Sequence, residues 1–133
     1  MTIKPSDHWR DSVAEEAREV ACGTRAPEEA FLARLFPESL LQATDTALGS
    51  FEAEVLALRT PSDDEVLGVV RRAVLALNAI NDEHGGGGYE TGEREELCEF
   101  IDGTLEEHGI DIPALAARNG IGAHEITDEW RDW

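Results

Sequence analysis

The side chains best suited to chemistry lie around four consecutive glycines at residues 85–88. Carboxylates and an imidazole, which hold cations or transfer protons, flank them at Asp82, His84, Glu90 and Glu93. Counted from Asp82 as in an EF-hand, the required glycine and the final glutamate fall in place. His84 and Gly86, however, occupy two positions that need oxygen ligands. The four residues are therefore weak metal candidates, and we predict neither a metal nor a cofactor.

The glycine run does not fit a phosphate-binding loop either. Such loops present backbone N–H groups at a strand-to-helix turn and usually add a lysine, whereas these glycines follow a predicted helix and have acidic neighbours. The pattern favours a flexible connector over residues 85–92, because glycine loses the most chain entropy when it is ordered. Tyr89 in this connector either packs into the core, which we favour, or contacts a partner, so it stays a candidate partner-binding residue.

Catalytic signatures are missing from the rest of the sequence. The run that begins at His124 places Asp128 where an HExxH motif needs its second histidine. Ser50 lacks the GxSxG pattern of a nucleophile elbow. With twenty-nine acidic residues, a pair of carboxylates says nothing specific about acid–base catalysis. We therefore predict no catalytic residues and lean toward a protein that is not an enzyme.

An acidic stripe on a predicted helix is the most informative feature. At about 100° per residue, the acids gather opposite the apolar side chains of residues 97, 101 and 105. They are Glu95, Glu99, Asp102 and Glu106. Each like-charge contact costs about 0.2–0.5 kcal/mol in an isolated helix, and no lysine interrupts the stripe. The stripe is either a solvated face that maintains solubility or a binding surface for a basic partner.

The chain ends with aromatic residues in an acidic setting. Trp130 stands four residues after Ile126, a spacing that suits core packing, whereas Trp133 is the better interface anchor. Ala116, Gly120 and Ile126 have the spacing of a helix-turn-helix unit. The second helix of that unit would be acidic and would repel phosphates, so we expect it to serve packing or protein binding.

The charge balance limits the classes of partner. Twenty-nine acids and eleven bases give a net charge of −18, which disfavours nucleic acid and anionic membranes. No apolar run is long enough to span a bilayer. Two cysteines outside any CxxC motif and a polar start indicate a reduced, cytoplasmic protein.

The chain length and the helical patterns predict one domain over residues 1–133, an all-α, single compact bundle of about five to six helices with no substantial sheet. Ser6 is the expected N-cap of a helix over 7–22, and a short apolar helix lies between Pro27 and Pro37. A third helix over 38–59 is bent or split at Gly49 and Ser50. A capping box of Ser62 and Glu65 starts the fourth. Thr91 caps a fifth that ends near residue 108, and a short sixth begins near Pro113.

Two segments of the sequence resemble known bacterial proteins. The segment LNAINDEHGGGGYETGEREELCEFI and the ending EITDEWRDW resemble small uncharacterised acidic bacterial proteins of actinobacterial type. By charge and size, the chain is also similar to bacterial immunity proteins and antitoxins that neutralise basic nuclease toxins. We therefore predict a non-enzymatic protein that binds a basic protein partner. The alternative is a small helical enzyme, or a ligand- or metal-binding protein, with its site near residues 81–93.

Overall fold

The computed structural model describes residues 4–30, 32, 36–85, 89, 91–122 and 125–127. It confirms the all-α prediction, and the described residues contain no strand. The elements are α1 (Pro5–Cys22), the 3₁₀ helix η1 (Pro27–Glu29), α3 (Glu38–Ala57), α4 (Asp63–Glu83), α5 (Thr91–Glu107) and α6 (Ile112–Arg118). Among the described residues there is no helix long and apolar enough to cross a membrane.

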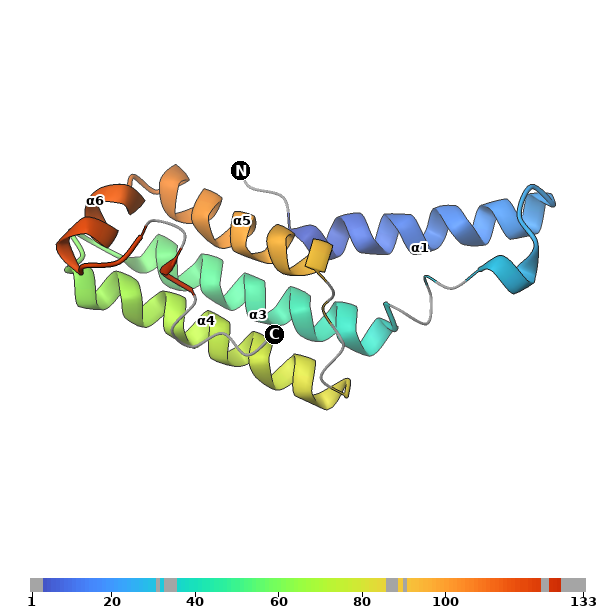
Figure 1. The fold of residues 1–133 in the computed structure, drawn as a ribbon, viewed down its shortest axis with the longest axis horizontal. Coiled ribbons are helices and arrows are strands. Elements are labelled where there is room, and N and C mark those ends of the chain that lie inside the picture. The colour runs from blue at the N-terminus through green and yellow to red at the C-terminus, as the bar shows by residue number, and fades with distance from the viewer. Residues whose placement is uncertain are drawn as a thin grey trace.

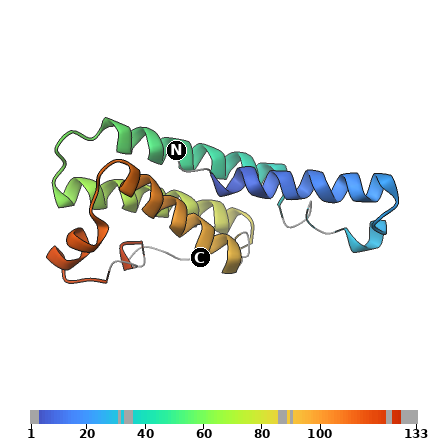
Figure 2. The ribbon, with the colours of Figure 1, turned by 90° about the horizontal axis from the view of Figure 1, so that it is seen from above.

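An antiparallel pair, α3 and α4, forms the centre of the bundle (Figure 1). The first half of α1 packs against α3 and α5, and its second half extends beyond the bundle together with η1, as Figure 2 also shows. Apolar side chains of α3, α4 and α5 share one buried core, which Trp9 of α1 joins. The bundle therefore has a projecting arm that the sequence did not predict.

Local signals explain the starts of the central helices. The capping box of Ser62 and Glu65 begins α4, since each residue's side chain bonds the other's backbone N–H. Thr91 stands at the start of α5 and Gly109 follows its end with a positive φ of 86°. These three predicted boundaries are confirmed to within a residue or two, although Thr91 is the first residue of α5 and not the cap that precedes it.

Two other predictions about helix ends and bends are wrong. Pro5, not Asp7, is the first residue of α1, and Lys4 rather than Ser6 is its N-cap. Ser6 is buried instead, and its hydroxyl donates to the Asp45 carboxylate of α3, a long-range bond that the capping pattern could not reveal. α3 is one continuous helix through Gly49 and Ser50, because packing on α4 holds positions where helix propensity is weak.

Several predictions fall outside the described residues. The short apolar helix between Pro27 and Pro37 is represented by η1 and by residues 32 and 36, since residues 31 and 33–35 are not described. Glu90, His124, Trp130 and Trp133 also lie outside the described residues. Of the proposed helix-turn-helix unit, Ala116 and Ile126 are buried and Gly120 has a positive φ of 70°.

Candidate functional site

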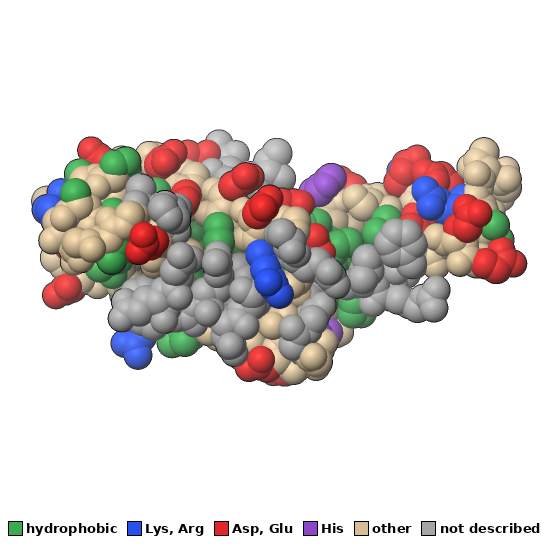
Figure 3. Space-filling view, viewed as in Figure 1, with side chains coloured by type: hydrophobic (Ala, Val, Ile, Leu, Met, Phe, Trp, Pro, Cys, Tyr) green, Lys and Arg blue, Asp and Glu red, His purple; other side chains and the backbone are tan. Residues whose placement is uncertain are grey.

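The stripe on α5 forms one continuous surface, which we call the α5 acidic face: Glu95, Glu99, Asp102 and Glu106. The helix is oriented by its opposite side, where Leu97, Ile101 and Leu105 are fully buried. Three of the four acids are exposed and Asp102 is half-buried. Figure 3 shows acidic side chains along the part of the surface that α5 occupies in Figure 1. The predicted grouping of these four residues on one side of a helix is therefore confirmed.

Most basic residues of the described chain are paired with acids elsewhere. Six of the nine form ion pairs with acids of α1, α3 or α4: Lys4, Arg10, Arg18, Arg25, Arg72 and Arg118. α5 has a single base, Arg94, whose Nε–H donates to the Tyr89 carbonyl at 3.1 Å. Within the described part of the chain, no base forms an ion pair with the α5 acidic face.

Two carboxylates have pKa values that are shifted in opposite directions by their surroundings. Arg118 at the end of α6 donates two hydrogen bonds to Asp63, at 2.8 and 2.9 Å, and holds the pKa of that carboxyl below its usual value. Asp102 has the reverse surroundings. Burial, and then the negative charges of Glu106 and Glu99, raise the pKa of Asp102 to about 6. Asp102 thus carries its charge against a penalty that comes first from burial and then from its two acidic neighbours.

Tyr89 does not belong to this surface. Its side chain is fully buried, its hydroxyl lies 2.7 Å from the Thr44 hydroxyl of α3, and its backbone N–H donates to the Asn81 side chain at 3.1 Å. Burial raises the pKa of the Tyr89 phenol to about 12. Its inclusion among the partner-binding candidates was wrong, and core packing was the right alternative. Removing the apolar ring from water stabilises the fold, and the hydroxyl still finds a hydrogen-bond partner inside.

An aromatic cluster positions the start of α5. The Trp9 ring stacks on Phe36 at 5.4 Å between ring centroids and lies 6.0 Å from the Tyr89 ring. The Trp9 indole N–H donates to the Glu96 carboxylate of α5 at 3.1 Å. α1, the start of α3 and the segment before α5 meet here. Sequence reasoning missed this junction, although a tryptophan on the apolar side of α1 was a signal for it.

The three weak metal candidates that the structure describes do not form part of a metal-binding group. Asp82 is exposed. The His84 Nδ1–H donates to the Ile80 carbonyl at 2.8 Å, and Nε2 is hydrogen-bonded to the Ser39 hydroxyl at 3.1 Å, so both ring nitrogens are used within the fold. Glu93 lies on α5 and Glu90 is outside the described residues. The described ranges contain no group of three or more His, Cys, Asp or Glu side chains that could hold a metal ion.

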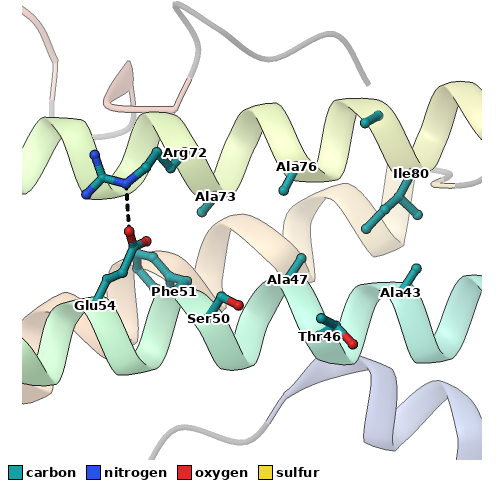
Figure 4. A pocket seen from close by; sticks show the side chains of 11 residues that line it. Ala43, Thr46, Ala47, Ser50, Phe51, Glu54, Arg72, Ala73, Ala76 and Ile80 are labelled. Carbon is teal, nitrogen blue, oxygen red and sulfur yellow. Dashed lines mark hydrogen bonds and ion pairs between the residues drawn. The ribbon is translucent and has the colours of Figure 1, made fainter.

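A groove between α3 and α4 is a second surface feature, which the sequence did not predict. It has a volume of about 590 Å³, and Figure 4 shows side chains from both helices along it. Five alanines contribute to its lining: Ala43, Ala47, Ala73, Ala76 and Ala79. An ion pair between Glu54 and Arg72, 2.6 Å apart, joins the two helices at the same groove. Alanines are also common simply as helix formers, so the pattern in sequence did not indicate a hollow.

Comparison with protein-family models, with curated proteins and with solved structures returned no match.

Proposed function

We propose that the protein is a non-enzymatic binding protein whose α5 acidic face docks onto a basic surface of a partner protein. One observation carries the proposal. Four carboxylates share one side of α5 without a cation in the described chain, and the pKa of Asp102 is raised to about 6 by burial and by its acidic neighbours. An approaching lysine or arginine would offset the repulsion among these carboxylates, whereas an acid already paired within the fold would gain much less.

The charge also favours rapid association. A net charge of −18 attracts a cationic protein over distances of about a Debye length, roughly 8–10 Å at moderate salt. The same charge repels nucleic acid and anionic lipid. Specificity then comes from the positions of the four acids on a helix that the buried Leu97, Ile101 and Leu105 hold rigidly.

The finer form of the proposal is an inhibitor of the immunity or antitoxin type, in a bacterial cytoplasm, that covers a basic toxin. It is supported by the small size of the chain, the acidic excess and the helical fold. A cationic enzyme that itself binds nucleic acid presents the positive surface that such an acidic face complements.

The direct test replaces Glu95, Glu99, Asp102 and Glu106 by lysine in one variant. Affinity capture from the lysate of the cell that makes the protein, at low salt, is then compared with capture by the wild type. We expect loss of a basic protein that the wild type retains, together with an unchanged helical circular dichroism signal.

A matched control reverses four other exposed acids: Glu28, Glu29, Asp82 and Glu83. It changes the net charge by the same amount and should retain the partner. If both variants lose the partner equally, binding depends on total charge and not on the α5 acidic face. If both retain it equally, the proposal is disproved.

A further inference from the structure

We propose that α1 is an autoinhibitory strap. It occupies a docking surface on α3 and α5 that fits a basic segment with an aromatic anchor, and it must lift before a partner can bind there. Residues 23–37 connect α1 to α3, and a connection of this length lets α1 move away while the chain stays intact. The kind of partner rests on the proposed function, whereas the strap rests on contacts within the fold.

The centre of the docking surface is aromatic. The Trp9 side chain of α1 is 2% exposed and contacts the rings of Phe36 and Tyr89. Its indole N–H donates to the Glu96 carboxylate of α5 at 3.1 Å. A buried aromatic ring with one polar edge is a typical anchor of a protein interface. The ring that α1 seats here therefore indicates the kind of side chain that a partner would insert.

Acidic side chains of α3 lie beside the aromatic centre and pair with bases of α1. Glu38, Asp45 and Glu52 stand seven residues apart, which is close to two helical turns, so they share one side of α3. Lys4 Nζ lies 3.0 Å from the Glu52 carboxylate. Arg10 Nη2 lies 3.0 Å from the Asp45 carboxylate and 3.3 Å from that of Glu38. Two bases of α1 thus occupy three acids that a basic partner would otherwise meet.

α1 is held by less apolar burial than the centre of the bundle. Only four of its 18 residues are buried, and Trp9 is the single large apolar side chain among them. α4 buries eight of its 21 residues, and seven of these are apolar. Because burial of apolar surface supplies most of the free energy that holds a helix in place, we expect α1 to open at a lower free energy than the whole fold.

The projecting arm of α1 is bonded within itself. Arg25 pairs with Glu19 at 2.7 Å, and the Leu32 backbone N–H donates to the buried Glu16 carboxylate at 3.1 Å. These bonds lie in the part of the molecule that extends beyond the bundle in Figure 2. α1 can therefore lift together with η1 as one body, and only the contacts at the docking surface need to break.

The first test is native-state hydrogen exchange of the full chain. We expect the amides of residues 10–13 to exchange through an opening roughly 100-fold more favourable than the global unfolding that buried amides of α4 report. Lys4→Gln with Arg10→Gln removes the ion pairs to α3 and should favour this opening by roughly tenfold more. Arg18→Gln with Arg25→Gln removes the same charge, but those ion pairs lie within the arm, so the change should stay within about twofold. Exchange of α1 and α4 through one common opening overturns the proposal.

The second test adds a fluorescently labelled synthetic peptide of residues 4–22 to the full chain and measures anisotropy. In the wild type the chain's own α1 occupies the surface, so the peptide should bind weakly. Trp9→Ala in the full chain loosens the strap and should tighten peptide binding at least about tenfold, because apparent affinity follows the fraction of open molecules. A peptide that itself carries Trp9→Ala should lose this binding. Equal affinity of the peptide for the wild type and the loosened chain overturns the proposal.

Two further measurements keep the tests decisive. Circular dichroism shows whether each variant stays helical, and the chain with Lys4→Gln and Arg10→Gln serves in the peptide assay if Trp9→Ala does not fold. It too should bind the peptide roughly tenfold more tightly than the wild type does. Neither assay uses the partner that the α5 acidic face captures. The strap can therefore fail while the proposed function stands, and the proposed function can fail while the strap stands.

Discussion

The α5 acidic face and the α3–α4 groove differ in charge, although both belong to a strongly acidic chain. On α5, four carboxylates gather without a cation in the described chain, and Asp102 has a raised pKa. At the groove, Glu54 and Arg72 form an ion pair, and five alanines are among the lining residues. Charge is thus concentrated on one surface and removed from another. The difference suggests that the first surface attracts a cationic partner, whereas the second offers such a partner no net charge to bind.

The strongest test of this contrast alters one surface at a time. Lysine at the four acids of the α5 acidic face should reduce capture of the basic partner roughly 100-fold. Ser50→Glu with Ala79→Glu adds acids at exposed positions of the groove and should change capture by less than about twofold, because these positions belong to a different surface. Capture is measured on the wild type and on both variants. Loss of the partner in the groove variant would contradict the contrast.

Salt should weaken the binding of the partner to the α5 acidic face. Raising salt from low to high screens the attraction between opposite charges. We therefore expect partner affinity to fall by roughly tenfold, and to fall by the same factor in the groove variant. Titration calorimetry with the captured partner measures both changes. An affinity that salt does not alter would show that the α5 acidic face has been assigned the wrong chemistry.

Replacement of Tyr89 by phenylalanine tests which residues belong to the α5 surface. The change removes the hydroxyl that bonds Thr44 at 2.7 Å and leaves the Thr44 hydroxyl buried without that partner. We expect a loss of about 1–2 kcal/mol in the free energy of unfolding, measured by urea denaturation. Capture of the basic partner should not change, because the side chain is inaccessible. A large loss of capture with normal stability would return Tyr89 to the binding surface.

Asp102→Asn should have the smallest effect, and its sign depends on pH. The pKa of Asp102 is raised to about 6 in the fold, above the value of about 3.9 in an unfolded chain. The ionised carboxylate therefore destabilises the fold above pH 6, and the wild type gains stability as pH falls from about 6 toward 4. At neutral pH we expect the variant to be more stable by on the order of 1 kcal/mol, after allowance for solvent screening.

The advantage of Asp102→Asn should shrink as the pH is lowered through 6 to 5, where the wild-type carboxyl becomes protonated. Urea denaturation at neutral pH and at pH 5 measures the difference. Glu28→Gln, at an exposed position of η1, is the control and should change stability little at either pH. A gain for Asp102→Asn that does not depend on pH would rule out ionisation as its cause.

The sequence predicted most of the features that depend on interactions within a few residues. Ser62 with Glu65 indicated where α4 begins and Gly109 where α5 ends, because caps and left-handed glycines satisfy backbone groups of their own helix. Thr91 indicated where α5 begins, to within a residue. The side of α5 that holds its four acids followed from helical periodicity in the same way. Local signals failed at Ser6, whose hydroxyl bonds Asp45 thirty-nine residues away instead of capping α1.

What the sequence by itself determined is therefore the helical class, most of the helix boundaries and the grouping of acids on α5. The tertiary structure decided that Tyr89 is buried against Thr44, that Trp9 reaches Glu96, and that α3 and α4 leave a neutral groove. The physical reason is the range of the interactions. Backbone hydrogen bonds and side-chain periodicity within a helix join residues three or four apart, whereas burial, packing and ion pairing between helices depend on which distant segments meet.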